Sequence, residues 1–188
     1  RVLNSSGYVK EETRERVQKV IKELNYTPSA IARSLSKNET NTIGVIVPDI
    51  TNSYFSEVIK GISQVADKNN LNIIFYNTEN LLEKEIKSLN LLKAQRIKGV
   101  IMTPGFGADD FDNTYKEVIN ALGCPLIFAC ADVKDIEANG IFVDNEKGAY
   151  EAVNLLIRNG HRKIGILLGT LSSEPMSQRL SGYKKALH

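Results

Sequence analysis

The feature that most constrains the fold is a regular alternation of short apolar runs with longer segments of helical periodicity, which begins at residue 43. The apolar runs cover 43–47, 72–76, 100–103, 126–129, 141–143 and 163–168. The segments between them, at about 54–69, 82–95, 111–122 and 147–159, carry apolar residues at the spacing of amphipathic helices. Strands that alternate with helices predict βαβ units and a parallel sheet.

Two details make this prediction more specific. The first three runs begin at residues 43, 72 and 100, and this step is the length of one βαβ crossover. The first run reads Ile-Gly-Val-Ile-Val, and a run without polar alternation is typical of a strand buried on both faces. We therefore expect an α/β fold with a doubly wound, mainly parallel sheet.

A doubly wound sheet binds ligands beyond the carboxyl ends of its strands. The segments expected at that edge are 48–54, 77–80, 104–110, 130–135, 144–145 and 169–179. They include Asp49, Asp132 and Asp144. These carboxylates suit acid–base chemistry as well as hydrogen bonding to polyol hydroxyls, so they do not separate an enzyme from a binding module.

Residues 1–40 follow a different pattern. Apolar side chains recur at helical spacing between residues 10 and 24, with Glu11 and Glu12 in the first turn and Asn25 after the last. Ser29 is a candidate N-cap for a short second helix at 30–36. Of the net charge of +2, residues 1–40 carry +3 and the remainder −1. This asymmetry fits a segment that faces nucleic acid, and equally an ordinary solvated helix.

The composition, with 42% hydrophobic and 24% charged residues, is that of a globular protein. No apolar run approaches the ~18 residues of a membrane helix, and the first 30 residues do not resemble a signal peptide. We therefore expect a cytoplasmic protein without a membrane partner. Cys124 and Cys130 lack the paired spacing of a zinc site, so we expect thiols and no structural metal.

No enzyme motif has the spacing that its chemistry requires. The first strand-to-helix turn, 48–53, lacks the glycines of a dinucleotide site, and the loop 105–110 places Asp109 and Asp110 where phosphates would lie. These aspartates, with Asp112, are expected to cap the next helix. His161 is expected at the edge of the sheet opposite the ligand loops, and His188 ends the sequence. We expect no catalytic residues and no cofactor.

Nine motifs, in one order and at one spacing, resemble the LacI/GalR family of bacterial transcription regulators. They are RVLN (1–4), VKEETRERV (9–17), LNYTP (24–28), AIARSL (30–35), TIGVIVPDI (42–50), NSYF (52–55), VDN (143–145), GHRKI (160–164) and RLSGY (179–183). The resemblance implies a helix-turn-helix headpiece, a hinge helix that folds in the DNA minor groove, and a two-lobed effector domain similar to periplasmic sugar-binding proteins.

The resemblance also implies domain boundaries. It assigns 1–28 to a partial headpiece, 29–42 to the hinge helix and linker, 43–169 to the N-terminal lobe and 170–188 to the start of the second lobe. The small all-α remnant would thus precede an α/β lobe. The first two headpiece helices and most of the second lobe are expected to lie outside the 188 residues.

The same resemblance implies the DNA-binding residues, which are Arg1, Asn4, Tyr26, Ala32, Arg33, Leu35 and Lys37. Leu35 matches a leucine wedge that enters a central base step, unstacks it and bends the duplex. Arg33 and Lys37 would contact phosphates, which makes binding salt-dependent without reading sequence. Without the resemblance, Leu35 would be an ordinary helix-packing leucine.

The residues implied for effector binding are Asn52, Tyr54, Phe55, Ser56, Cys130, Asp144 and Arg179. An aromatic pair can stack on a sugar or base ring, and Arg179 can hold hydroxyls or an anion through its fork of donors. Phe55 also lies on an apolar helix stripe, which leaves core and ligand wall open for it. Cys130 stands where many relatives carry an aspartate that accepts hydrogen bonds from sugar hydroxyls, which leaves the effector's identity open.

The resemblance therefore implies a non-enzymatic homodimer, a repressor, that binds a pseudo-palindromic operator. A small metabolite in the cleft between the lobes, expected to be a sugar or sugar derivative, would control the operator affinity, and a phosphocarrier protein is a further candidate partner. One alternative is a sugar-binding protein for transport, which should begin with a signal peptide rather than a charged helical arm. A second alternative is an enzyme on the same scaffold.

Overall fold

The computed structural model of the chain describes residues 2, 7–26, 40–105, 113–130, 136, 138–169 and 173–188. The chain divides into two compact units, residues 1–40 and 41–188. The hinge helix expected at 30–36 lies outside the described residues. Six of the seven predicted DNA-binding residues also lie outside them, namely Arg1, Asn4, Ala32, Arg33, Leu35 and Lys37.

The first unit contains the helix α1, Glu11–Glu23, which confirms the helix expected at 10–24. Glu11 and Glu12 lie in its first turn and Lys22 in its last, an arrangement that is favourable for the helix dipole. The helix is capped by Leu24, and the next residue, Asn25, has a φ of 46°, in the left-handed region that asparagine tolerates better than most residues.

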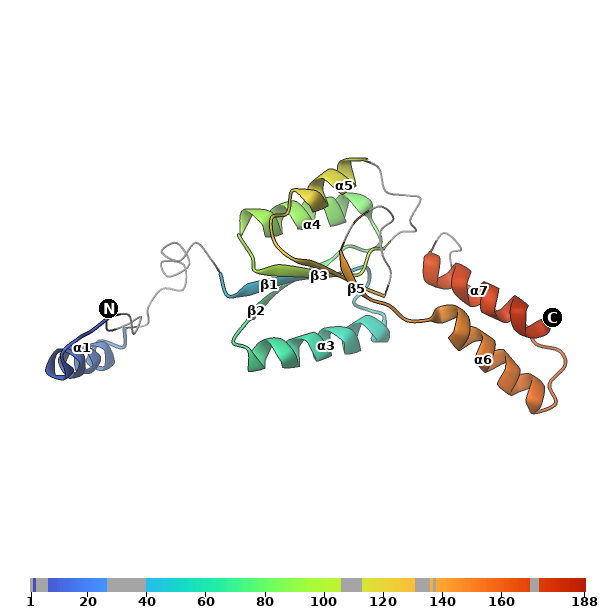
Figure 1. The fold of residues 1–188 in the computed structure, drawn as a ribbon, viewed down its shortest axis with the longest axis horizontal. Helices are drawn as coiled ribbons and strands as arrows, with labels where there is room; N and C mark the ends of the chain where they lie inside the picture. The colour runs from blue at the N-terminus through green and yellow to red at the C-terminus, as the bar shows by residue number, and fades with distance from the viewer. Residues whose placement is uncertain are drawn as a thin grey trace. The chain divides into compact units, whose positions relative to one another are not determined.

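The second unit is built on one sheet of five parallel strands in the order β2-β1-β3-β4-β5 (Figure 1). The strands are β1 Thr42–Val47, β2 Asn72–Asn77, β3 Gly99–Met102, β4 Leu126–Ala129 and β5 Asn139–Ile141. β1 pairs with β2 from Thr42 opposite Asn72, and with β3 from Ile43 opposite Gly99. Because β1 has a partner on each side, its last four residues are buried, as its unbroken apolar sequence predicts.

Helices cover both faces of this sheet. α3, Ser53–Lys68, lies on one face, whereas α4, Leu82–Ala94, and α5, Asn113–Asn120, lie on the other (Figure 1). Each of these helices connects one strand to the next along the chain, which is the βαβ arrangement that the periodicity predicts. The expected doubly wound α/β fold is confirmed.

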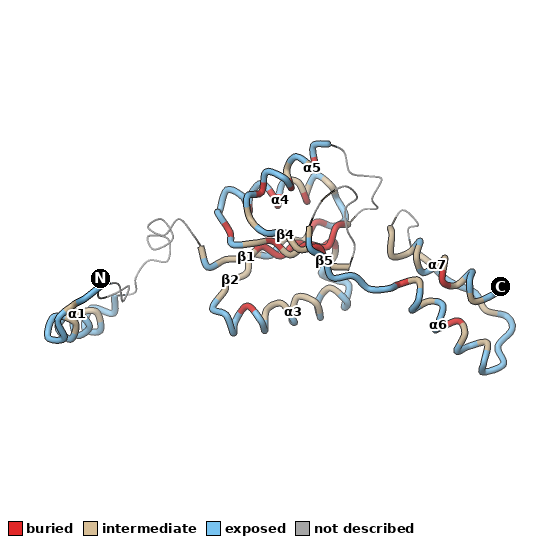
Figure 2. Tube along the Cα trace, in the orientation of Figure 1, coloured by how far each residue is buried: buried red, intermediate tan, exposed pale blue. Residues whose placement is uncertain are grey.

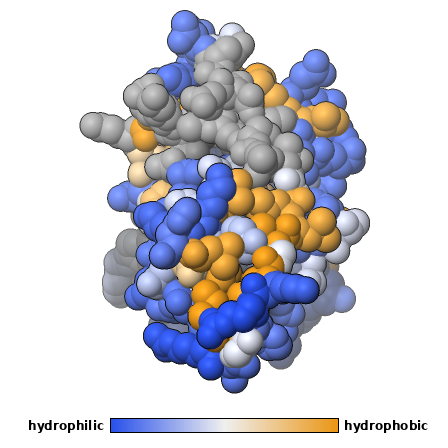
Figure 3. Space-filling model, turned by 90° about the vertical axis from the view of Figure 1, so that its right-hand side faces the viewer, coloured by the Kyte–Doolittle hydropathy of each residue, from blue (hydrophilic) through white to orange (hydrophobic). Residues whose placement is uncertain are grey.

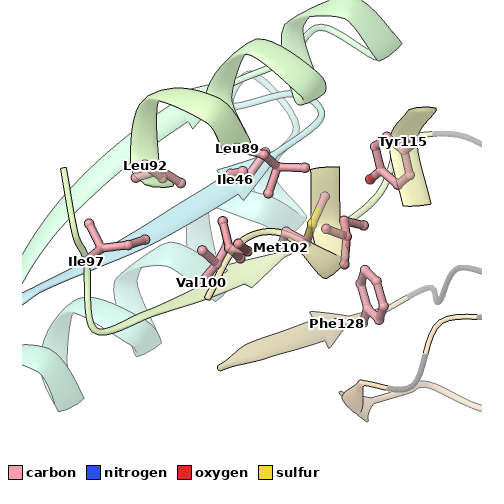
Figure 4. Packing of buried hydrophobic residues seen from close by; sticks show 10 residues of the cluster. Ile46, Leu89, Leu92, Ile97, Val100, Met102, Tyr115 and Phe128 are labelled. Carbon is pink, nitrogen blue, oxygen red and sulfur yellow. The ribbon is translucent and has the colours of Figure 1, made fainter. Parts of the chain in front are cut away.

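The core lies between the sheet and the pair α4 and α5. The buried residues of α4 are Glu85, Ser88, Leu89 and Leu92, and their spacing places them on one face of the helix. Figure 2 shows the buried positions concentrated on the central strands and on this helix. In Figure 4, Leu89 and Leu92 pack with Ile46, Val100 and Met102 of β1 and β3. The strand ends on this side of the sheet are therefore held by a closely packed layer that is mostly apolar.

Two strand predictions were wrong in detail. β5 covers Asn139–Ile141 rather than 141–143, so Phe142 and Val143 continue beyond the sheet and are about half exposed. Residues 163–168 form no strand, and Leu167 is fully exposed. The physical reason is that a strand requires a neighbour to hydrogen-bond with, and no strand among the described residues lies beside this segment.

The two C-terminal helices, α6 Asn145–Arg158 and α7 Glu174–Leu187, pack side by side (Figure 1). Their contact is close because Gly182 of α7 lies against the backbone of α6, where a Cβ atom would overlap the Glu146 carbonyl oxygen. Ser181 donates a hydrogen bond to the Glu146 carboxylate at 2.6 Å, and Lys185 pairs with the same carboxylate. Tyr183 Oη donates to the Ile164 carbonyl at 2.8 Å, and this bond connects α7 to the segment that follows α6.

Apolar surface remains exposed on this second unit. Figure 3 shows apolar side chains gathered on the face that it presents. The exposed apolar residues near the C-terminus include Leu155, Leu156, Ile166, Leu167 and Leu187. Among the described residues, no helix combines the length and the apolar character that a membrane crossing would require.

Candidate ligand-binding site

A cavity of about 700 Å³ opens at the carboxyl ends of the strands. β1 is followed along the chain by β2 on one side, whereas β3 lies on its other side, so the winding direction reverses at β1. Such a reversal leaves a crevice at the strand ends, which is the usual ligand site of a doubly wound sheet. The cavity volume is that of a small-molecule site. Its lining residues are Pro48, Asp49, Asn52, Tyr54, Phe55, Asn80, Thr103, Pro104, Gly105, Cys130, Val143, Asn145, Gly169, Ser173, Pro175, Met176 and Arg179.

The loop that follows β1 is held by short-range hydrogen bonds. One oxygen of Asp49 accepts hydrogen bonds from the Thr51 amide at 2.8 Å and from the Thr51 hydroxyl at 2.7 Å. These bonds lower the pKa of Asp49, the hydroxyl bond having the larger effect, so this carboxyl is ionised at neutral pH. Asn52 caps α3 by accepting from the Tyr54 amide at 3.0 Å. The loop therefore presents a carboxylate and an aromatic ring at fixed positions.

Ser56 braces this loop from behind. Its hydroxyl donates to the Ile50 carbonyl at 3.0 Å, and the residue is not among those that line the cavity. The structure therefore places Ser56 in support of the site, whereas the sequence pattern predicts a ligand contact.

Tyr54 and Phe55 form an edge-to-face aromatic pair on the cavity wall, with ring centroids 5.3 Å apart. Tyr54 is 46% exposed, and Phe55 is partly buried. For Phe55, the two roles left open by the sequence are both compatible with the structure, because the residue begins the apolar stripe of α3 and also lines the cavity.

Cys130 joins the β4 end of the cavity to α3. Its Sγ lies 2.8 Å from Oη of Tyr54, and its φ of 75° turns the chain immediately after the strand. The hydrogen bond with Cys130, aided by burial, raises the pKa of Tyr54 to about 12. Tyr54 is therefore a neutral phenol at physiological pH and can donate or accept a hydrogen bond.

Arg179 brings a positive charge to the cavity from α7. Its Nε donates to the side-chain oxygen of Asn145 at 2.9 Å, and Asn145 in turn donates to the Val143 carbonyl at 3.1 Å. Asn145 is buried, so it orients the guanidinium group on a rigid support. The planar fork of an oriented arginine suits hydroxyl groups or an anion.

Asp144 lies just outside the cavity wall. Its carboxylate accepts from the Lys147 amide at 2.9 Å and caps α6. Cys130, Arg179, Asn52, Tyr54 and Phe55 are thus brought together, whereas Asp144 and Ser56 are not among the lining residues.

Several lining residues were not singled out from the sequence, among them Asn80, Thr103, Asn145, Ser173 and Met176. Most of them lie in the segments expected beyond the strand ends. The topology therefore predicted which loops form the cavity, but not which side chains of those loops line it. Asn145 follows directly on Asp144, and periodicity cannot tell which of two neighbours faces a cavity.

Tyr26 is the one predicted DNA-binding residue that the structure describes. It is 53% exposed and lines an apolar groove of α1 together with Val17, Val20, Ile21 and Leu24. No residue of α1 is buried, so the apolar stripe of this helix lacks cover from the described residues.

In chemical terms, the described lining residues offer one arginine, one carboxylate, amide and hydroxyl groups, and an aromatic wall. No cluster of three potential metal ligands occurs among the described residues. A binding module for a small polar molecule with an apolar face requires this combination. The fold and the cavity together define the class as a binding domain with the architecture of one lobe of a periplasmic-type binding protein.

Comparisons with known proteins identify the family. Residues 40–188 match the family described as periplasmic binding proteins and sugar binding domain of LacI family, and residues 1–29 match the bacterial regulatory proteins of the lacI family. The chain belongs to the LacI family.

Three relatives illustrate the similarity. The ribose operon repressor of Haemophilus influenzae is 37% identical over 187 residues, which are 99% of this chain and 54% of that protein. The transcriptional repressor PurR of Vibrio atlanticus is 35% identical over 188 residues, which are 100% of this chain and 55% of that protein. A crystal structure of the lac repressor dimer bound to operator and an anti-inducer has a TM-score of 0.84 and 29% identity, over 100% of this chain and 56% of that one. The chain spans about half the length of the curated relatives it matches.

Proposed function

We propose that the chain is part of a transcriptional regulator, a repressor, that binds operator DNA as a homodimer and responds to a small metabolite. The observation that carries this proposal is a preformed small-molecule cavity in a chain whose first 29 residues match the lacI regulatory family. A match to this DNA-binding family favours a regulator over a transport protein of the same fold. Such a regulator acts in the cytoplasm, where its DNA is.

The proposed effector is a sugar or a sugar derivative. Asn52, Asn80 and Asp49 supply acceptors and donors for hydroxyl groups, and the Tyr54–Phe55 pair supplies a surface for the apolar face of a ring. Arg179 would hold an anionic or hydroxyl-bearing end of the molecule. The ligand would be released unchanged, because the described residues that line the cavity include no histidine base for a nucleophile.

The proposed mechanism is a shift between two orientations of the lobes. The effector acts through its different affinity for the two states, and each state either orders or melts the hinge helix at 30–36.

The domain boundaries inferred from the resemblance stay predictions. The packing of α6 on α7 supports a lobe boundary nearer to Asp144 than to residue 169, which we propose as a refinement.

Operator binding is tested first with the full-length protein. An operator is selected from a random duplex library, and gel shifts then compare the wild type with Leu35→Ala. If Leu35 is the wedge, the variant loses affinity and the bend in the duplex decreases. Leu155→Ala, a change at an exposed leucine of α6, is the matched control. Unchanged affinity and bending in Leu35→Ala would remove the wedge role.

Effector binding is tested by thermal shift. The full-length protein is screened against sugars, sugar phosphates, nucleobases and phosphocarrier proteins, the last to test a co-repressor. Tyr54→Ala and Arg179→Met are expected to lose the response, whereas Arg158→Met, at an exposed arginine of α6, is expected to keep it. Chemical conversion of the bound compound, abolished by Asp144→Ala, would support an enzyme instead.

A further inference from the structure

A fully buried carboxyl group lies directly behind the cavity wall. Glu85 is on the inner face of α4, beside Leu89 and Leu92, and its residue exposure is 0%. One carboxylate oxygen accepts from the Gly105 amide at 2.7 Å, and the other accepts from the Tyr115 hydroxyl at 2.8 Å. A buried carboxylate is tolerated when hydrogen bonds compensate its lost hydration, and here both oxygens have a donor.

These two bonds connect three separate elements. Glu85 belongs to α4, Tyr115 belongs to α5, and Gly105 follows β3 in the cavity lining. Glu85 is not itself a lining residue, so it acts on the cavity through the backbone of Gly105.

The wall is closely packed at this point. A Cβ atom on Gly105 would lie 3.1 Å from the Cα atom of Asn80 and 3.1 Å from Oε1 of Glu85. Asn80 also lines the cavity, with a φ of 57°. A small displacement of Gly105 would therefore change the positions of two lining segments.

We propose that Glu85 is a positioning residue of the cavity, whose carboxylate holds the Gly105 amide and thereby fixes the β3 side of the wall against α4 and α5. The interpretation of the cavity as an effector site rests on the proposed function, whereas the bond between Glu85 and Gly105 can be tested without any ligand.

The ionisation of Glu85 provides a way to test its hydrogen bond with the Gly105 amide. Burial raises the pKa of Glu85, and the bonds from Gly105 and Tyr115 partly oppose this effect. Tyr115 is the titratable group that faces Glu85 among the described residues, and burial keeps it neutral by raising its pKa. When Glu85 is protonated, the charge-assisted bond to the Gly105 amide becomes an ordinary one. The chemical shift of this amide should follow the ionisation of Glu85.

Isotope labelling can isolate the Gly105 amide. Pro104–Gly105 is the single Pro–Gly pair in the sequence, so labelling with 13C-carbonyl proline and 15N-glycine selects this one amide of the 188 residues. In the full-length protein, the Gly105 resonance is assigned as the one that Gly105→Ala removes, and its shift is expected to titrate with an apparent pKa above the ordinary glutamate value of 4.5. Glu85→Gln should abolish the titration while retaining protection from hydrogen exchange, because the glutamine oxygen still accepts the bond.

Three variants provide the controls. In Glu85→Ala, exchange of the Gly105 amide is expected to accelerate about tenfold or more. In Tyr115→Phe, which removes the bond on the α5 side, the amide should stay protected and should still titrate. Glu83→Gln, at an exposed position of the same helix, should change nothing.

A Gly105 titration that persists in Glu85→Gln would overturn the inference, as would unchanged exchange in Glu85→Ala. If Glu85→Ala does not fold, the comparison of wild type with Glu85→Gln still decides the question. A failed screen for operator and effector, with the Gly105 titration observed as expected, would reject the proposed function and leave the positioning role of Glu85 intact.

Discussion

The contact between Cys130 and Tyr54 shows how one residue changes the chemistry of the cavity. A carboxylate at the strand end would bring a charge and two acceptors, whereas a thiol is a small and weakly polar group. The 2.8 Å contact instead joins the thiol to the phenol of Tyr54, which also lines the cavity. At this position the chain therefore has a contact between two residues of the cavity wall rather than a charged acceptor.

The first prediction concerns the Tyr54 phenol. Its pKa of about 12 depends first on the hydrogen bond with Cys130, because this bond favours the neutral form. Cys130→Ala should therefore move the Tyr54 pKa down toward its ordinary value of 10.0, as measured by NMR of 13Cζ-labelled tyrosine. Tyr54→Phe identifies the resonance, and Cys124→Ala is the matched control. An unchanged Tyr54 pKa in Cys130→Ala would show that burial alone causes the shift.

The second prediction concerns stability and pH. Since burial raises the pKa of Glu85 in the folded state, the folded protein binds this proton more tightly than the unfolded chain does. The contribution of Glu85 to the free energy of unfolding should therefore decrease as pH rises from the ordinary glutamate pKa to the raised one. Denaturant unfolding across this range should show that the free energy of unfolding of the wild type and of Glu83→Gln decreases relative to that of Glu85→Gln. The same slope in all three proteins would contradict the prediction.

At the scale of elements, periodicity predicted the first four strands and the helices α3 to α6 to within two residues, but it failed for the strands expected at 141–143 and 163–168 and did not predict α7. α3 and α4 begin and end within one residue of the ranges expected from their apolar spacing, because each helix closes its own hydrogen bonds. The segment 163–168 has the composition of a strand but has no neighbouring strand among the described residues. A strand makes its backbone hydrogen bonds with a neighbouring strand, so an apolar run alone does not show that a strand forms.

The third prediction tests the crossing of α6 and α7. Gly182→Ala should destabilise the protein by about 1–3 kcal/mol, because the added methyl group overlaps the α6 backbone and the helices must separate. Gly148→Ala is the control in the same helix pair, since a Cβ atom there meets nothing within 4 Å. It should leave stability unchanged or raise it by up to ~1 kcal/mol through helix propensity. Thermal and urea unfolding measure both changes, and equal effects would refute the close crossing.

At the scale of the whole molecule, the charge distribution separates two roles. Residues 1–40 carry +3, and residues 41–188 carry −1. A net charge of +2 is too small to indicate a partner, whereas a basic arm next to a near-neutral binding unit fits the proposed division between DNA and effector.

The fourth prediction follows from this division. Because each phosphate contact releases about one counterion and the proposed homodimer carries two copies of Arg33, Arg33→Ala should reduce the slope of log affinity against log salt by about 2 on the selected operator. Leu35→Ala should lower affinity and bending with little change in the slope, since a wedge neutralises no phosphate. Lys93→Ala, in the last turn of α4, is the control on the near-neutral unit. Equal slopes for the wild type and Arg33→Ala would mean that Arg33 makes no phosphate contact.

The sequence alone determined the fold class, the edge of the sheet at which the cavity opens, and the family. Periodicity follows from helix and strand geometry, and the order of strands and helices in turn restricts the topology. Asn52, Tyr54, Phe55, Cys130 and Arg179 could be predicted because they occupy motif positions in loops that the topology brings to one edge.

The tertiary structure decided which side chains meet. Ser56 donates a hydrogen bond that supports the loop after β1, and Asp144 caps α6. Asn145, by contrast, accepts a hydrogen bond from Arg179 and orients it. Glu85 appeared in the sequence as an unremarkable polar residue of an amphipathic helix, yet it is buried between Gly105 and Tyr115. Such roles depend on distances between segments far apart in the chain, and local periodicity carries no information about those distances.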